Sequence, residues 1–135
     1  MNNIRFATVL HILTLLRMKE GQLLSSEFIA GSVNVNAAVV RKEIKNLRSL
    51  EFIDSKEGKG GGYSLGKSAK KIYLSDLYKA ISETHLLGKS HNPNPDCPVG
   101  KNINSHLNDL FETVDKEFLK QIKQITLEDF SKKFF

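Results

Sequence analysis

The stretch from Ser25 to Gly66 constrains the fold more than any other part of this sequence. A short apolar segment and a turn lead into a helical repeat that runs from Asn36 to about Leu50. Two short segments in which apolar and polar residues alternate then flank a run of glycines. A helix, a turn, a second helix and a two-stranded hairpin, in this order, are typical of a winged helix-turn-helix. We therefore predict a mainly α fold with a small β-hairpin wing.

Apolar spacing and capping residues predict the elements around this stretch. We expect helices over residues 3–19, from Ser25 to the turn residues Gly31 and Ser32, from Asn34 or Asn36 to Leu50, over 76–82 after the cap Ser75, over 101–123, and after the cap Thr126. Prolines and asparagines predict a loop before the long helix. The expected units are a DNA-binding domain over 1–83, a loop with a candidate sensing role over 84–100, and a dimerisation helix with a short C-terminal helix over 101–135.

The helix after Asn36 has an apolar side and a basic side. Val40, Ile44 and Leu47 share one face, and the basic residues lie opposite or along a flank. An ordinary amphipathic surface helix would show the same pattern, and a plain flexible hairpin would explain the glycines. The expected DNA-contacting residues of the helix and wing are Ser25, Ser26, Asn36, Ala38, Arg41, Lys42, Lys45, Arg48, Lys56, Lys59, Gly60, Gly61 and Gly62.

The distribution of charge favours the DNA-binding interpretation. The whole chain carries a net charge of +5, and residues 41–71 contain nine Lys or Arg against four acidic residues, which is also +5. A solvated basic face is the ordinary reading of such a run. Clustering of the entire excess on the helix and wing indicates a polyanionic partner.

Other function classes find little support in the sequence. Gly61–Ser68 matches the letters of a phosphate-binding loop, but such a loop must open a helix after a buried strand, and the surrounding pattern predicts a wing strand instead. No catalytic set is recognisable, so we expect no enzyme. No apolar run is long enough to span a bilayer, and the N-terminus lacks a cleavage site, so we expect no membrane partner and a cytoplasmic location.

A broad apolar stripe follows the long helix. Its width for a small domain indicates that the helix packs partly on its own domain and partly on a second subunit. The expected dimer-interface residues are Ile103, Leu107, Leu110, Phe111, Val114, Phe118 and Ile122.

Several runs resemble the Rrf-two family of bacterial winged-helix transcription regulators. The matching runs are Ser25–Ala30, Val39–Arg41 with Leu47–Arg48, Gly58–Gly66, Ile72–Ala80 and Asn94–Gly100. The resemblance implies a homodimer whose two recognition helices read a palindromic operator, with the wings in flanking minor grooves. We expect a sequence-specific regulator that acts as a repressor. The alternative is a winged-helix module for protein–protein or RNA contact without specific DNA binding.

Cys97 is the only cysteine in the sequence. Cluster-binding members of the family place three cysteines in this loop, so we expect no iron–sulfur cluster and no other cofactor. His85, His91 and His106 do not have metal-site spacing with Cys97, so no metal is expected. A thiol just before a helix is a candidate redox sensor with a lowered pKa, although a partly buried structural cysteine is the favoured reading. The effector would be an oxidant or a small molecule.

Overall fold

The computed structural model describes residues 4–135. Within them the elements are α1 (Arg5–Met18), α2 (Ser26–Val33), α3 (Ala37–Ser49), β1 (Ile53–Lys56), β2 (Gly62–Leu65), the 3-10 turn η1 (Ala69–Lys71), α4 (Leu74–Ile81), α5 (Pro98–Ile122), α6 (Leu127–Ser131) and the 3-10 turn η2 (Lys132–Phe134). This is the predicted mainly helical fold with one two-stranded antiparallel hairpin and a long helix near the C-terminus. None of the helices in the described range is both long and apolar enough to cross a membrane.

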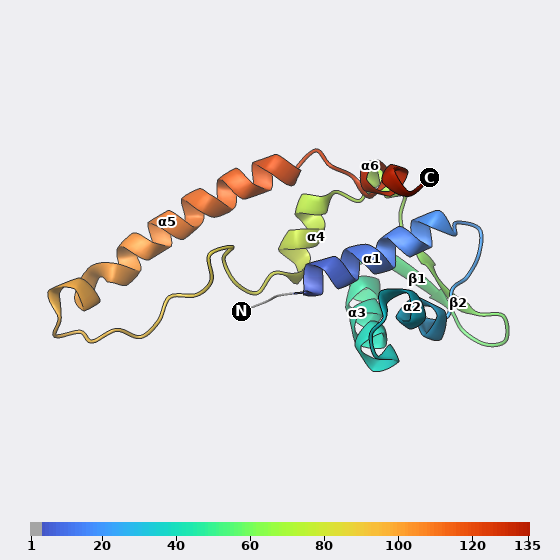
Figure 1. Ribbon diagram of the computed structural model, residues 1–135, viewed down its shortest axis with the longest axis horizontal. Coiled ribbons are helices and arrows are strands. Elements are labelled where there is room, and N and C mark those ends of the chain that lie inside the picture. The colour runs from blue at the N-terminus through green and yellow to red at the C-terminus, as the bar shows by residue number, and fades with distance from the viewer. Residues whose placement is uncertain (1–3) are drawn as a thin grey trace.

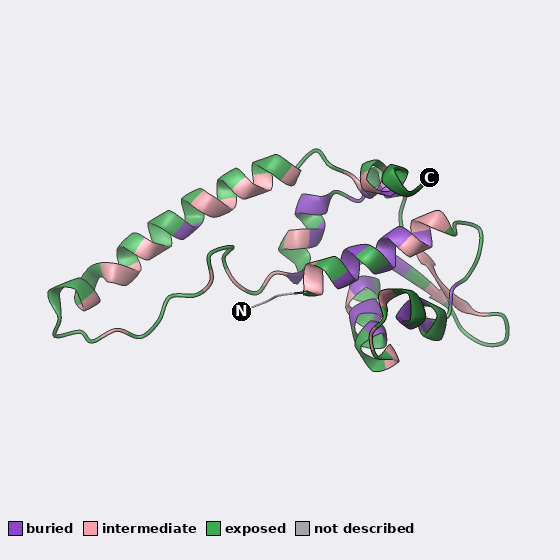
Figure 2. Cartoon of the chain, viewed as in Figure 1, coloured by how far each residue is buried: buried purple, intermediate pink, exposed green. Residues whose placement is uncertain are grey.

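The core is built around α1. Val9, Ile12 and Leu13 are fully buried on this helix because apolar residues at helical spacing fall on the sides that α2, α4 and α6 cover. Figure 1 shows α1 across the middle of the body, with α2 and α3 on one side and α4 on the other. In Figure 2 the buried residues concentrate in α1, α3 and α4, whereas α5 is mostly exposed.

The predicted turn at Gly31 and Ser32 is wrong. Both residues lie inside α2, which continues to Val33. The chain turns at Asn34, whose φ of 61° is left-handed and whose N–H donates to the Ala30 carbonyl at 2.8 Å. Asparagine tolerates this conformation better than most residues, so it ends the helix where glycine would be the usual choice. Asn36 then caps α3 as expected, accepting from the Ala38 N–H at 2.7 Å.

The predicted cap Ser75 is also wrong, since α4 begins one residue earlier, at Leu74, and Ser75 is buried within the helix. The physical reason is long-range backbone pairing. The Leu74 N–H donates to the Ile125 carbonyl at 2.9 Å, and the Leu127 N–H donates to the Ile72 carbonyl at 2.7 Å. These bonds fix the backbone before α4 and bring the C-terminal segment back onto the body.

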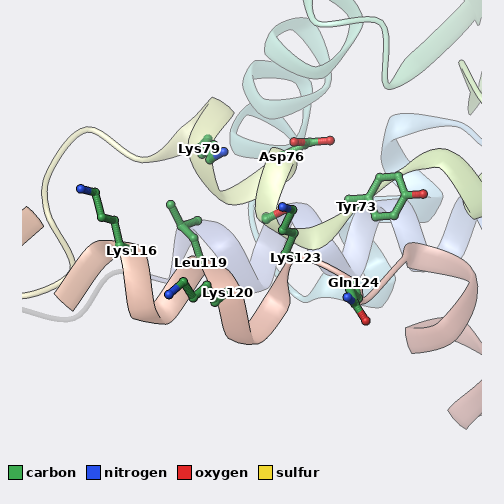
Figure 3. Close-up of a pocket in the computed structure, with 9 residues that line it drawn as sticks. Tyr73, Asp76, Lys79, Lys116, Leu119, Lys120, Lys123 and Gln124 are labelled. Carbon is green, nitrogen blue, oxygen red and sulfur yellow. The ribbon is translucent and has the colours of Figure 1, made fainter. Parts of the chain in front are cut away.

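α5 begins at Pro98, three residues before the predicted start at 101. It projects away from the body, and the loop after α4 runs back along it (Figure 1). Several contacts hold this loop to the helix: Asp115 bonds the His85 ring at 2.6 Å and accepts from the Leu86 N–H at 3.0 Å, and Asn104 donates to the His91 carbonyl at 3.1 Å. Near the body, α4 and α5 diverge and leave a cleft between them (Figure 3).

α6 closes the body on the side of α1. Thr126 caps it in a capping box with Asp129, as the sequence predicts. Arg17 of α1 binds both carboxylate oxygens of Glu128, at 2.8 and 2.9 Å, and this contact holds the pKa of Glu128 below its ordinary value. α6 therefore packs with α1 to α4 around the hydrophobic core, although α5 lies between α4 and α6 in the sequence.

Candidate nucleic-acid interface

The outer side of α3 is basic and free of apolar packing. Arg41, Lys42, Lys45 and Arg48 are exposed, whereas Val40, Ile44 and Leu47 lie in the core. Ala38 is exposed at the N-terminal end of the same side. A helix with small residues at one end and cations along its outer side can approach base edges and phosphates together.

A polar hollow of about 310 Å³ lies between the start of α2 and the wing. It brings together several predicted contact residues, namely Ser25, Ser26, Arg48, Lys56, Gly61 and Gly62. The N–H groups at the start of a helix lack partners within the helix, and such groups bind phosphate well; in α2 the Ser25 side chain already occupies that of Phe28. Glu27 and Glu57 also line the hollow and offset the charges of Arg48 and Lys56, so attraction for an anion there depends on the N–H groups at the start of α2.

The two serines at this helix start have different environments. Ser25 is exposed and its hydroxyl accepts from the Phe28 N–H at 3.1 Å. Ser26 is buried, and its hydroxyl donates to Glu27 at 3.3 Å. The Ser26 side chain therefore faces its own helix, and only its backbone is placed to meet a phosphate.

The wing is tied to the helix-turn-helix by a third extended segment. Leu24 and Tyr63 exchange two backbone hydrogen bonds of 3.0 and 2.8 Å. Gly62 lies where a Cβ atom would come within 2.8 Å of the Leu24 carbonyl oxygen, so this close approach requires glycine. Lys59 and Gly60 are exposed at the tip, where a narrow groove would admit a turn with so little side-chain bulk.

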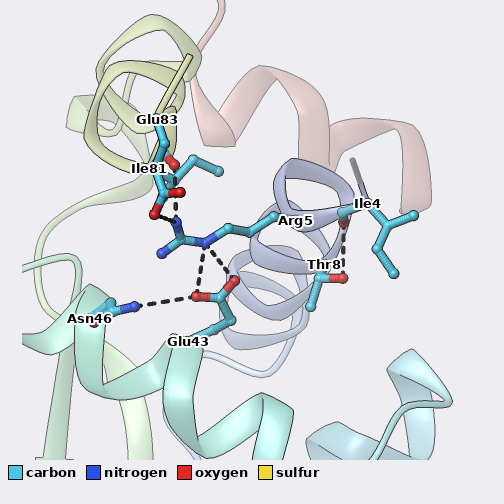
Figure 4. Close-up of polar contacts among 7 residues, drawn as sticks. All are labelled: Ile4, Arg5, Thr8, Glu43, Asn46, Ile81 and Glu83. Atoms are coloured by element: carbon cyan, nitrogen blue, oxygen red, sulfur yellow. Dashed lines mark hydrogen bonds and ion pairs between the residues drawn. The ribbon is translucent and has the colours of Figure 1, made fainter. Parts of the chain in front are cut away.

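An ion pair on the core-facing side of α3 joins this helix to α1, and the sequence did not predict it. Glu43 accepts from the Arg5 Nε at 2.8 and 3.1 Å, and Arg5 also donates to the Ile81 carbonyl at 3.0 Å (Figure 4). Bonding to Glu43 raises the pKa of Arg5, against the opposing effect of burial. One guanidinium therefore joins α1, α3 and the end of α4.

The sequence does contain a signal for this pair. Glu43 follows Val40 by three residues and precedes Leu47 by four, so it falls on the buried face of α3. A carboxylate in that position requires a cationic partner, although spacing alone cannot identify Arg5.

The run Gly61–Ser68 does not form a phosphate-binding loop. Gly62–Leu65 is strand β2, and the residues after it form only the short turn η1. The Lys67 ammonium lies 4.6 Å from the centre of the Phe52 ring. This lysine is engaged in a cation–π contact instead of pointing into a phosphate cradle.

Cys97 is exposed and forms the N-cap of α5. The N–H groups of Gly100 and Val99 lower the pKa of its thiol, because they stabilise the negative sulfur. The thiol is exposed and lies outside the hydrophobic core.

The predicted interface residues of α5 divide between two environments. Phe111 is buried and lies against His85, with ring centres 5.0 Å apart, and Phe118 lies against Tyr78 at 4.8 Å. Ile122 packs against the core. Ile103, Leu107 and Val114 are half-buried, and Leu110 is 50% exposed.

The donor set of this chain does not fit a cysteine-ligated iron–sulfur cluster. A single thiol cannot replace the three that such a cluster takes from one subunit. In the described part of the chain, no three His, Cys, Asp or Glu side chains gather in an arrangement that could hold a metal ion.

Known proteins resemble the chain along most of its length. The family model Rrf2, described as an iron-dependent transcriptional regulator, matches residues 3–133. YwnA of Bacillus subtilis (strain 168), assigned as an HTH-type transcriptional regulator, is 40% identical over 130 residues, which are 96% of each chain.

Solved structures share the fold. A structure assigned as a transcriptional regulator from Lactobacillus plantarum has a TM-score of 0.81 at 24% identity, over 97% of this chain and 89% of that one. A structure assigned as a DNA-binding protein has a TM-score of 0.72 at 36% identity, over 93% of this chain and 97% of that one. The chain belongs to the Rrf2 family of helix-turn-helix transcriptional regulators, which are DNA-binding proteins and not enzymes.

Proposed function

We propose that this protein is a homodimeric repressor that binds a palindromic operator with sequence preference. The observation that carries the proposal is the exposed basic side of α3, which adjoins the hollow between α2 and the wing through Arg48. In this arrangement α3 enters the major groove, α2 and the hollow contact a phosphate, and the wing tip enters the flanking minor groove. Such a DNA partner would place the protein in the cytoplasm.

Fluorescence anisotropy with DNA from upstream of the protein's own gene tests the binding. We expect the affinity to fall steeply with salt and to exceed that for scrambled DNA. Arg41→Ala combined with Lys45→Ala should weaken binding about 1,000-fold, since the dimer loses four contacts and each costs about 1 kcal/mol or more. The control is Lys132→Ala with Lys133→Ala, which removes the same charge from η2.

Two results together would refute the assignment of α3 as the DNA-contacting helix. The protein would bind upstream and scrambled DNA with equal affinity, and the Arg41→Ala/Lys45→Ala variant would keep that affinity. Retained binding of RNA or protein under those conditions would favour the alternative module. Repression itself predicts higher transcription from the target promoter when the gene is deleted, and a fall in transcription would identify an activator.

The dimer proposal rests on the apolar surface that α5 leaves exposed. Val99 is 67% exposed and Leu110 50% exposed on a helix whose other apolar residues pack on the same chain only in part. If the apolar side of α5 packed against the same side of a second copy, the exposed apolar side chains of both copies would be removed from water. Leu110→Glu should produce monomers in analytical ultracentrifugation, whereas Leu50→Glu, at an exposed position outside α5, should leave the dimer intact.

We also propose that Cys97 makes DNA binding sensitive to peroxide. The thiolate attacks one oxygen of hydrogen peroxide, the O–O bond breaks, and the products are a sulfenic acid and hydroxide. The support is the exposed thiol with a lowered pKa at the start of α5. Peroxide should weaken operator binding, a thiol reductant should restore it, and Cys97→Ser should respond to neither. An equal response in Cys97→Ser would contradict the proposal.

A further inference from the structure

The cleft between α4 and α5 has about 570 Å³ of free volume and is built from both helices. At one end it reaches Tyr73 and Gln124, next to the backbone pairing of residues 72–74 with 125–127. Tyr78 of α4 and Phe118 of α5 join the two helices, with ring centres 4.8 Å apart. The cleft is therefore a fixed feature of the fold and not a gap between unconnected helices.

Four lysines line this cleft. Lys116, Lys120 and Lys123 follow each other at helical spacing on α5 and its C-cap, with Leu119 among them, and Lys79 comes from α4 (Figure 3). Residues three and four apart share one face of a helix. Three lysines of α5 and its C-cap thus line the same cleft as the one on α4.

Little negative charge opposes these lysines. Asp76 is the one acidic residue that lines the cleft, and Lys120 is paired with Glu117 at 3.2 Å. Within residues 4–135, Lys79, Lys116 and Lys123 form no ion pair. Like charges around one cleft repel each other, so an anion between them would relieve that repulsion.

Neither proposed interface uses these lysines. In Figure 1 α4 and α5 lie on the opposite side of α1 from α2 and α3, so the cleft is separate from the basic side of α3. The dimer proposal rests on Val99 and Leu110, which are exposed and do not line the cleft, whereas Phe118 and Ile122, next to the lysines, pack on their own chain.

We propose that the α4–α5 cleft is a binding site for a small organic anion with two or more carboxylate or phosphate groups. Lys79 would bind one charged group, and Lys116, Lys120 and Lys123 would bind the others. Tyr73 and Leu119 provide apolar wall for the carbon skeleton. The free volume lies within the range of small-molecule sites. The anion bridges the body and the projecting helix.

The test is a titration of the uniformly ¹⁵N-labelled full chain, without DNA, using pyrophosphate as the phosphate probe and citrate as the carboxylate probe. Sodium chloride keeps the ionic strength constant, because exposed charges are screened by salt. We expect amide shift changes confined to residues 73–79 and 116–124 with at least one probe. The probe that binds identifies which of the two charged groups the site takes.

Lys79→Ala combined with Lys123→Ala should weaken the binding about tenfold, since each exposed ion pair contributes about threefold. Lys101→Ala with Lys133→Ala removes the same charge elsewhere and should leave the affinity unchanged. Lys79→Arg with Lys123→Arg keeps the charge and should retain binding, which separates loss of the site from loss of folding.

Equal weakening in the two alanine variants would overturn the proposal, because the anion would then be sensing net charge alone. Shift changes centred on α3, or no saturable shift with either probe, would overturn it as well. So would a loss of affinity for DNA in Lys79→Ala/Lys123→Ala as large as the loss for the anion, which would assign the lysines to DNA. The titration contains no DNA, so its result is independent of whether an operator is found.

Discussion

Replacing Glu43 with glutamine tests how strongly its ion pair with Arg5 holds α3. The substitution keeps the size of the side chain and removes its charge, which leaves the Arg5 guanidinium half-enclosed between α1, α3 and the end of α4 (Figure 4). The carbonyl of Ile81 remains as an acceptor for Arg5 at 3.0 Å, and Glu83 lies 3.6 Å away in a largely exposed position.

The burial of the two partners sets the size of the effect. Breaking a fully buried pair costs about 3–5 kcal/mol, and an exposed pair contributes at most about 1 kcal/mol. The Glu43 side chain is 8% exposed and that of Arg5 is 28% exposed. We therefore expect Glu43→Gln to lower the free energy of unfolding by about 2 kcal/mol, which corresponds to about 8 °C in the melting temperature of a domain of this size.

The assay is urea unfolding followed by circular dichroism, at one protein concentration, because the proposed dimerisation would add a concentration-dependent contribution to stability. Glu27→Gln is the matched control. Its carboxylate lies 3.9 Å from Arg41, with the two side chains 75% and 53% exposed, so the change should stay within about 0.5 kcal/mol.

A double-mutant cycle separates the pair from its surroundings. Arg5→Met combined with Glu43→Met leaves no uncompensated charge, so the loss should be smaller than the sum of the two single losses. If Glu43→Gln is as stable as Glu27→Gln, or if the two methionine substitutions add without coupling, the ion pair does not hold α3 in place.

Four further substitutions have measurable outcomes. Gly31→Ala should raise the free energy of unfolding by about 0.5–1 kcal/mol, because this glycine is helical and its added Cβ meets no atom within 4 Å; Gly61→Ala should lower it, because its Cβ would overlap the Lys56 carbonyl. Thr126→Ala should cost about 1 kcal/mol in the same urea experiment through loss of the capping box on α6. Burial opposes ionisation of Asp115, but bonds from the Leu86 N–H and His85 outweigh it and lower its pKa from the ordinary 3.8. The Leu86 amide should therefore be fully protected from hydrogen exchange above pH 3.8. This protection should disappear as the pH falls through the pKa of Asp115 in the folded state, which lies below 3.8. Asp115→Asn should lack this pH dependence.

Local sequence signals predicted the elements whose limits depend on adjacent residues. Asn36 and Thr126 cap their helices as expected because a cap needs only its own side chain and an N–H two or three residues further on. The wing follows from the glycines between two alternating segments. Pro98 suited the first position of α5, although the predicted helix began later.

Local sequence signals did not predict the structure where it depends on residues far away in the chain. The start of α4 depends on pairing with residues 125–127, about fifty positions away, so the serine at position 75 suggested the wrong cap. The partner of Glu43 lies 38 residues earlier. The lysines of the α4–α5 cleft come from two helices separated by a long loop, and their proximity becomes visible only when both ends of that segment meet the body.

The backbone pairing between residues 72–74 and 125–127 also has an evolutionary consequence. The chain leaves the body at Ile81 and is back in hydrogen-bonded register with it at Ile125, so everything between forms an excursion with both ends anchored. The entropy of closing such an excursion changes only slowly with its length. Insertions or deletions of whole helical turns in the outer half of α5 can therefore accumulate between relatives without disturbing the core. In the dimer proposed above, such changes would also alter the spacing between the two copies of α3.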